Sequence, residues 1–294
     1  MAVQTIEELV EHCERMNEGL ADWMLALEAE TSGQPKEAII HKMKERLIKM
    51  KEAVDAGVSD ASSAPSGISG GDAYRLGVYK EQGQYVSGSL ITDAMRFAFA
   101  TSETNARMGV IVATPTAGSA GILPGCLFSL YENANLSFEK LVMGLFTASA
   151  IGYIIANRSF ISGAAGGCQA EVGSATAMAA AAIVELRGGT PHQAVHAAAV
   201  ALKSMLGLVC DPVAGLVEVP CIKRNVIGTS IAFSAADIGL AGITSRIPLD
   251  EVIAAMYDIG RTMPVSLRET ARGGLAITPT GQKIKDRIMS GAKV

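Results

Sequence analysis

The pattern of hydrophobic and polar positions along the chain predicts helices from the start. Apolar residues recur at helical spacing over residues 5–30, and Thr5 with Glu8 forms a capping-box pattern at the beginning. Gly33 ends this helix, and Pro35 suits the first turn of a second one. We interpret the two helices as a solvated helical hairpin, because they are rich in charged residues.

The amino-acid composition of the chain changes after this region. Residues 57–72 are rich in Gly and Ser, and beyond them the charge falls while Gly and Ala become more frequent. We therefore predict an N-terminal helical hairpin over residues 1–60 and a helical main body over residues 61–294. The two parts form either separate domains or one continuous domain.

The charge-poor part contains further runs of helical character. Residues 171–186 are rich in Ala, Thr190 opens another helix with a capping pattern, and residues 225–241 and 248–259 complete the set. The alternation of apolar and polar residues that indicates a β-strand is approached only in two short runs, VIVAT and LVEVP. The sequence therefore predicts a predominantly helical fold of the α class.

Composition narrows the range of functions. The formal charge is −4, and no large Lys/Arg cluster is present, which argues against a nucleic-acid surface. The first twelve residues lack a basic region followed by an apolar run, so we expect no signal peptide. Without secretion, the five Cys are expected to be reduced thiols rather than disulfides.

Two stretches without charge, residues 108–131 and 141–157, are long enough to suggest membrane spans. The first contains two Pro and four Gly, and lipid-exposed backbone cannot be broken that often. We interpret it as buried, irregular backbone and expect no membrane association.

Three of the cysteines lie at the ends of predicted helices, beside Gly or Pro. Cys168 precedes one helix, Cys210 follows another, and Cys221 comes soon after, whereas Cys13 and Cys126 look like small buried hydrophobes. The spacing matches no zinc finger and no common ferredoxin, so three buried thiols remain an alternative. Three thiolates around a cubane of four irons would leave one iron open as a Lewis acid.

The segment ATPTAGSAGILPG combines hydroxyl groups with glycines. Glycine lets the backbone approach a ligand and point successive N–H groups at an anion, and a carboxylate is a natural guest. The alternative is a tight turn whose hydroxyls bond its own backbone. The candidate ligand-binding residues are Thr114, Thr116, Gly118, Ser119 and Gly121.

Taken together, ATPTAGSAGILPG, ISGAAGGCQAEVGSA, GLVCDPVAGLVEVPCIKRN and GITSRIP resemble the α subunit of the two-subunit bacterial iron–sulfur L-serine dehydratases. The resemblance runs from about Gly67 to Gly281, and the motifs stand in the same order. It implies an all-helical catalytic body and an oxygen-labile 4Fe–4S cluster on Cys168, Cys210 and Cys221. It also implies that no pyridoxal phosphate is used.

The same resemblance implies a separate β subunit and hence a hetero-oligomer. It further implies a cytoplasmic lyase of amino-acid catabolism that feeds gluconeogenesis. Single-chain relatives carry the β part fused at their N-terminus and a Cys near the C-terminus that can reach the cluster. This chain ends SGAKV, without such a Cys.

We therefore expect an L-serine ammonia-lyase that forms pyruvate and ammonia, with the open iron polarising the substrate hydroxyl. The loop from Thr114 to Gly121 would bind the substrate carboxylate, and Asn225 would supply a further donor. For Lys223 and Arg224, a role in the site and a place on the surface are equally expected.

The base that removes the α-proton is harder to assign. Ser119 is the candidate catalytic hydroxyl, although a hydroxyl acts as a base only with strong local activation. No histidine has a neighbour pattern that suggests catalysis; the four are His12, His41, His192 and His196. The simpler hypothesis is that the β subunit supplies the base. A non-catalytic assembly or regulatory subunit, a membrane transporter component and a zinc-dependent lyase are the alternatives.

Overall fold

The computed structural model describes residues 3–291. The first two residues and residues 292–294, which belong to the amino-terminal and SGAKV segments, lie outside the described range. Within that range the chain is helical and contains no strand, so the predicted α class is confirmed. A single isolated bridge joins Cys210 to Arg268.

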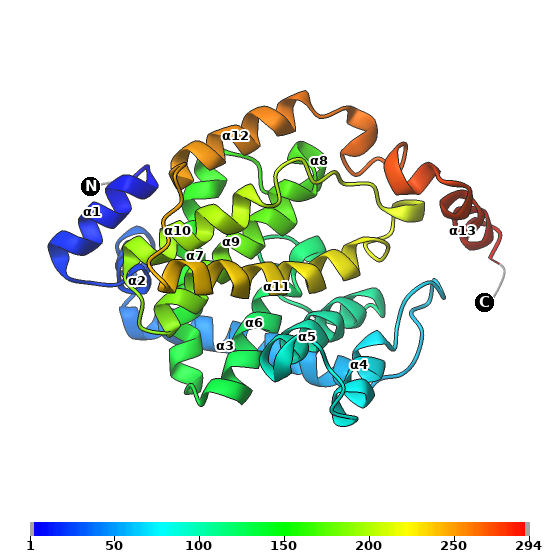
Figure 1. The fold of residues 1–294 in the computed structure, drawn as a ribbon, viewed down its shortest axis with the longest axis horizontal. Coiled ribbons are helices and arrows are strands. Elements are labelled where there is room, and N and C mark those ends of the chain that lie inside the picture. The colour runs from blue at the N-terminus through cyan, green and yellow to red at the C-terminus, as the bar shows by residue number, and fades with distance from the viewer. Residues whose placement is uncertain (1–2, 292–294) are drawn as a thin grey trace.

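Figure 1 shows the arrangement of the helices, which are joined by connections of varied length. The α-helices are α1 (Ile6–Met16), α2 (Leu20–Ser32), α3 (Lys36–Val58), α4 (Asp72–Glu81), α5 (Gly88–Ala106), α6 (Ile122–Ala134), α7 (Phe138–Arg158), α8 (Gly163–Gly166), α9 (Ser174–Leu186), α10 (Pro191–Lys203), α11 (Cys221–Leu240), α12 (Leu249–Thr262) and α13 (Pro279–Met289). Short 3₁₀-helices are η1 (Ala117–Ser119), η3 (Val213–Gly215), η4 (Val265–Leu267) and η5 (Gly274–Ile277), and η2 (Gln169–Gly173) is a π-helix.

Helix α9 lies at the centre of the bundle. Every residue from Ser174 to Val184 is buried, and α6, α7, α10 and α11 pack around it. Its sequence SATAMAAAAIVEL presents small side chains on all sides, and a helix that is apolar all round belongs in a core. In Figure 1, α11 crosses in front of this centre, and α12 runs along the upper edge.

Glycines bring the helices into backbone contact at two crossings. A Cβ atom on Gly57 of α3 would lie 2.3 Å from the carbonyl oxygen of Ala100 in α5. On Gly125 of α6 it would lie 2.7 Å from the carbonyl oxygen of Ala94. Both helices therefore pack against α5 at a distance that only glycine permits.

The prediction of one helix over residues 5–30 is wrong, because the chain breaks between α1 and α2. Asn17 adopts a left-handed conformation (φ 53°) and its N–H caps the end of α1. Gly19 follows, and a Cβ atom there would lie 2.1 Å from a carboxylate oxygen of Glu185 in α9. The predicted capping box of Thr5 and Glu8 is confirmed.

The N-terminal helices join the rest of the molecule through their apolar faces. Buried residues such as Leu9, Trp23 and Leu47 belong to the same hydrophobic cluster as the residues of α9. The loop that follows α3 is held by Arg107, whose guanidinium donates to the carbonyl oxygens of Asp60 and Ser62 at 3.1 and 2.7 Å. A domain division at residue 60 stays a prediction.

Two predicted helix bounds in the main body differ from the structure, whereas the two runs with some alternation do not alter the predicted α class. VIVAT and LVEVP form no strands; the first precedes η1 and the second leads into the start of α11. Helix α11 begins at Cys221 rather than residue 225. Helix α12 continues through Gly260, because that glycine packs inside the fold, where its Cβ atom would lie 3.0 Å from the Cα atom of Gly166.

Among the described residues, only α7 is long and apolar enough to cross a membrane by length and composition. Of its most apolar window, 61% is buried inside the protein, as is usual for a core helix. Residues 108–131, by contrast, contain irregular backbone, η1 and only part of α6, so the predicted irregularity is confirmed. The predicted burial is wrong for residues 108–118, which are exposed or half-buried, and correct for residues 119–130.

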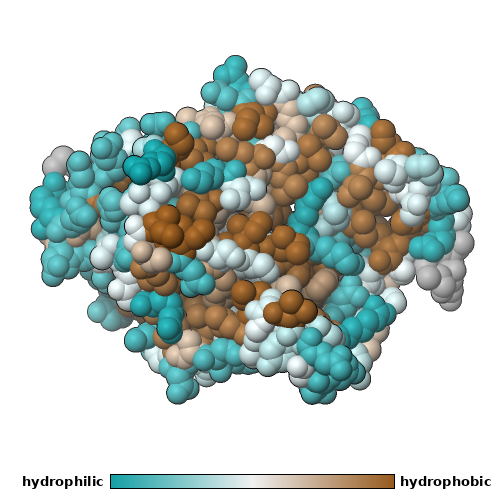
Figure 2. Space-filling model, in the orientation of Figure 1, coloured by the Kyte–Doolittle hydropathy of each residue, from teal (hydrophilic) through white to brown (hydrophobic). Residues whose placement is uncertain are grey.

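The surface is not uniformly polar. Hydrophobic residues gather over the middle of the face that α11 crosses, while hydrophilic residues cover most of both ends of the molecule (Figure 2). Exposed apolar side chains on or near this helix include Ile227, Ile243 and Ile247. Apolar side chains that gather in this way are typical of protein–protein contact surfaces.

Candidate active site

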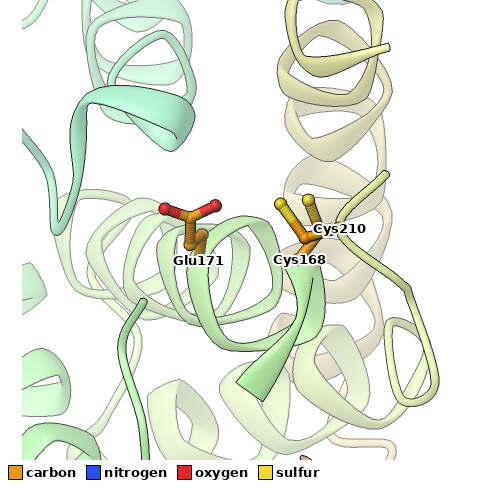
Figure 3. A group of neighbouring side chains, drawn as sticks. All are labelled: Cys168, Glu171 and Cys210. Carbon is orange, nitrogen blue, oxygen red and sulfur yellow. The ribbon is translucent and has the colours of Figure 1, made fainter. Parts of the chain in front are cut away.

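The three singled-out cysteines are all buried, and two of them lie at the start of a helical element. Cys168 directly precedes η2, Cys210 lies in the loop after α10, and Cys221 is the first residue of α11. The sulfur atoms of Cys168 and Cys210 and a carboxylate oxygen of Glu171 lie within 4.8 Å of one another (Figure 3). Cys221 stands outside this tight group.

The π-turn of η2 arranges two of these side chains. Cys168 and Glu171 lie at the start of the helical segment that continues into α9, and both point to the same side as Cys210 (Figure 3). A π-turn inserts an extra residue into a helical turn and often occurs at functional sites. It places a thiol and a carboxyl side by side at the end of the central helix.

The thiols differ in acidity. A hydrogen bond from Cys210 and the charge of Arg224 lower the pKa of Cys168. The pKa of Cys210 is raised, because it donates that bond and is buried. Burial raises the pKa of Cys221 to about 12. Cys168 is therefore the thiol that ionises first, and thiolate is the form that binds metals.

Arg224 supplies the positive charge beside these thiols. Its Nη1 lies 3.5 Å from the Cys168 sulfur and donates to the carbonyl oxygen of Val209 at 2.7 Å, and its Nη2 pairs with Asp211 at 2.9 Å. The side chain is largely buried, so the surface alternative is wrong for Arg224. It is correct for Lys223, which is exposed and pairs with Asp72.

The predicted ligand loop bonds partly to itself. Ser119 is fully buried, and its hydroxyl donates to the carbonyl oxygen of Thr114 at 3.1 Å and lies 3.2 Å from the Thr116 hydroxyl. This is the arrangement that the tight-turn alternative describes. The hydroxyl of Thr114 is buried and has no hydrogen-bond partner among the described residues.

Asn225 connects this loop to the third cysteine. Its Oδ1 accepts the Gly121 N–H at 2.9 Å, and its Nδ2 donates to the carbonyl oxygens of Gly118 and Cys221 at 2.7 and 2.9 Å. One buried amide thus ties the loop to the first turn of α11. The sequence placed Asn225 near Cys221, but its bonds to the loop became visible only in three dimensions.

Glu171 was not selected from the sequence. Its carboxyl group is buried, and burial raises its pKa, while the Thr116 hydroxyl and the Gly163 N–H oppose that shift. A Cβ atom on Gly118 would lie 3.2 Å from its Oε2, and one on Gly163 would lie 2.7 Å from the same atom. The sequence did offer one indication, an acidic residue three positions after Cys168 at the start of an otherwise uncharged helical run.

Glu218 is a second carboxyl that the sequence did not single out. It is buried and accepts hydrogen bonds from the hydroxyls of Ser66, at 2.7 Å, and Ser69. These serines belong to the Gly-rich SGISGGD segment, which is thereby held against the residues that lead into Cys221.

The histidines gather elsewhere or lie alone. His192 and His196 have ring centroids 4.5 Å apart on α10 and line a separate cleft of about 500 Å³ with residues of α1 and α12. The Nδ1 of His196 accepts the Ser245 N–H, and His41 is exposed on α3. His12 lies on α1, 3.2 Å from Glu18.

The thiol group fits an iron–sulfur cluster by its chemistry. Three buried cysteines offer the thiolate ligands that such clusters use, and a nearby guanidinium balances their charge. Gly163 leaves room beside them, since its Cβ atom would lie 2.8 Å from the Cys210 sulfur. The close group of Cys168, Glu171 and Cys210 has donors that also suit a single metal ion.

The sequence comparisons identify the family to which this helical chain belongs. The chain matches the family model described as "Serine dehydratase alpha chain" over residues 15–276. It belongs to this family, and the predicted resemblance is confirmed.

Named relatives support the assignment over almost the whole chain. The "Probable L-serine dehydratase, alpha chain" of Bacillus subtilis (strain 168) is 55% identical over 98% of this chain and 96% of its own length. The "L-serine dehydratase, alpha chain" of Peptoniphilus asaccharolyticus is 42% identical over 96% and 97%. The "L-serine dehydratase" of Streptomyces coelicolor is 38% identical over 88% of this chain but only 58% of its own length.

We expect Asn225→Asp to release the 114–121 loop from α11. The new carboxylate keeps an acceptor for the Gly121 N–H but faces two carbonyl oxygens without a donor, which should cost about 1–3 kcal/mol. Hydrogen exchange at Gly118 to Gly121 should accelerate, and thermal unfolding should begin earlier. Asn157→Asp, which adds the same charge at an exposed position of α7, is the control. Equal protection of the loop in both variants would contradict this role.

Proposed function

We propose that this chain is the catalytic subunit of an L-serine ammonia-lyase that converts L-serine to pyruvate and ammonia. The observation that carries the proposal is the meeting of buried thiols and the 114–121 loop at one end of the central helix, in a member of the serine dehydratase family. The transporter and non-catalytic alternatives are not favoured by relatives of this kind.

Cys168, Cys210 and Cys221 would hold a 4Fe–4S cluster, and no pyridoxal phosphate is required. Bound there, the cluster supplies a Lewis acid to the substrate hydroxyl, because three thiolate ligands leave one iron open. The hydrogen bond from Cys210 and the charge of Arg224 lower the pKa of Cys168, which favours its thiolate form.

The 114–121 loop would bind the substrate carboxylate. Its glycine-rich backbone can present N–H groups, and the hydroxyls of Thr114, Thr116 and Ser119 add donors. The Thr114 hydroxyl has no partner among the described residues and is the donor most ready for a ligand. Asn225 orients the loop toward the cysteines through Gly118 and Gly121. Ser119 stays the candidate catalytic hydroxyl of this chain.

We expect each of the three variants Cys168→Ser, Cys210→Ser and Cys221→Ser to lose the cluster and the activity. Protein purified anaerobically should contain about four irons and matching acid-labile sulfide per chain, and should bleach in air. Cys13→Ala, at a buried thiol on α1, should keep the full complement. A normal cluster in Cys210→Ser would show that the ligand set is wrong. Zinc without sulfide would indicate a zinc-dependent lyase instead, and no metal at all would indicate a non-catalytic subunit.

We expect Ser119→Ala and Thr116→Ala to raise the KM for L-serine while the iron content stays unchanged. Loss of one hydrogen-bond donor to the carboxylate should weaken binding by about 1–3 kcal/mol. Ser234→Ala, on the exposed side of α11, controls for the loss of a hydroxyl elsewhere. An unchanged KM in both loop variants would remove the carboxylate-binding role.

We further propose that a separate β chain completes the enzyme in the cytoplasm, where thiols stay reduced and amino acids are degraded. Relatives of this length are named alpha chains, and the longer Streptomyces coelicolor relative aligns over only 58% of its length. No histidine accompanies the three cysteines within the described residues, so the base for the α-proton would come from the partner.

The isolated chain should therefore bind its cluster yet turn over L-serine poorly. Addition of the separately purified β chain under anaerobic conditions should restore activity with a saturable dependence on its concentration. Serum albumin at equal concentration is the control for nonspecific stabilisation. Full activity of the chain alone would refute the partner's role and would direct attention to the Ser119 hydroxyl as the base.

A further inference from the structure

We propose that the Glu171 carboxylate binds the α-ammonium group of the amino-acid substrate. The inference rests on the proposed function and assigns the one charged group of L-serine that the cysteines and the 114–121 loop leave without a partner. It makes Glu171 the residue that distinguishes an amino acid from a simple hydroxy acid.

The geometry of the substrate restricts where such a residue can lie. In L-serine the carboxylate and the ammonium are attached to one carbon, and the hydroxyl is one carbon further on. The three groups that bind them must therefore be immediate neighbours. A partner for the ammonium has to touch the carboxylate-binding loop and also lie beside the metal-binding thiols.

Glu171 meets both conditions. On one side its carboxylate lies against the loop, since a Cβ atom on Gly118 would come within 3.2 Å of Oε2. On the other side a carboxylate oxygen lies within 4.8 Å of the Cys168 and Cys210 sulfurs, and all three side chains point the same way (Figure 3). Glu171 thus occupies the junction between the two proposed subsites.

The other carboxylates near the cysteines are already engaged. Asp211 pairs with Arg224 and accepts the Leu275 N–H at 2.7 Å. Glu218 accepts the two serine hydroxyls of the SGISGGD segment. The charge of Asp211 is thus balanced by Arg224, and the carboxylate of Glu218 is bonded to the SGISGGD segment.

Glu171 also accepts hydrogen bonds, but it has no counter-charge. The groups that act on it are its burial, the Thr116 hydroxyl, the Gly163 N–H and the like charge of Glu269, with no cation among them. A buried carboxylate without a counter-charge is costly, and an ammonium guest would provide that charge in hydrogen-bond contact. The π-turn and the glycines around the carboxylate keep it in place for this contact.

The experiment uses anaerobically prepared wild-type and Glu171→Gln enzymes, complete with cluster and β chain. Their KM for L-serine is compared with the inhibition constants of L-alanine and 3-hydroxypropanoate. L-Alanine has the carboxylate and the ammonium but no hydroxyl, whereas 3-hydroxypropanoate has the carboxylate and the hydroxyl but no ammonium. Iron, sulfide and the visible absorption of the cluster are measured in every sample.

Glu171→Gln removes the charge and keeps the shape. We expect L-serine and L-alanine to bind about tenfold or more weakly, because a hydrogen bond to a charged partner is lost. Binding of 3-hydroxypropanoate should be unchanged or tighter, and the cluster content should equal that of the wild type. Glu269→Gln, which removes the exposed like charge that acts on Glu171, should weaken the binding of none of the three ligands.

Three results would overturn the inference. The first is that Glu171→Gln loses equal affinity for L-alanine and 3-hydroxypropanoate. The second is that Glu171→Gln binds all ligands as the wild type does. The third is that Glu269→Gln, instead of Glu171→Gln, selectively loses affinity for L-serine and L-alanine. If Glu171→Gln loses its iron, the variant Glu171→Asp, which retains the charge, is tested. It should keep the cluster and the preference for L-alanine. Loss of iron in Glu171→Asp as well would show that Glu171 is a metal ligand and would overturn the inference. A wild-type enzyme that cannot turn over L-serine would refute the proposed function itself.

Discussion

The close packing of small side chains around α9 is the constraint on which the rest of the structure depends. Alanines on every side of this helix let four neighbours approach it, and glycines bring α3 and α6 into backbone contact with α5. Interiors packed this closely do not yield to small displacements. The end of α9 is therefore a rigid support, and the π-turn there holds Cys168 and Glu171 in one orientation.

Inside this apolar body, a few buried polar side chains each make several hydrogen bonds and so connect separate segments. Arg224 joins Cys168, Val209 and Asp211, and through Asp211 it also holds the backbone of Leu275 near the C-terminal helix. Asn225, the next residue, joins the 114–121 loop to α11. Because unpaired polar groups are costly in a core, these networks determine which loops surround the thiols.

The proposed chemistry divides naturally between this chain and its partner. In the proposed account, the cluster held by the cysteines, the 114–121 loop and Glu171 would bind the hydroxyl, the carboxylate and the ammonium group of L-serine. The described residues bring no histidine to that place, so proton abstraction is left to the β chain in this account. Such a division would keep the isolated chain from exposing a complete active site.

The sequence by itself determined the α class, the positions of most helices and the family, because capping residues, helical periodicity and long motifs are local signals. It also singled out three cysteines by their place near predicted helix ends, and their role as cluster ligands stays a prediction. Only the tertiary structure decided that α1 and α2 separate at Asn17, where Gly19 packs against the distant Glu185. It alone revealed Glu171 beside Gly118 and Gly163, because contacts between residues far apart in the chain leave no periodic trace in the sequence.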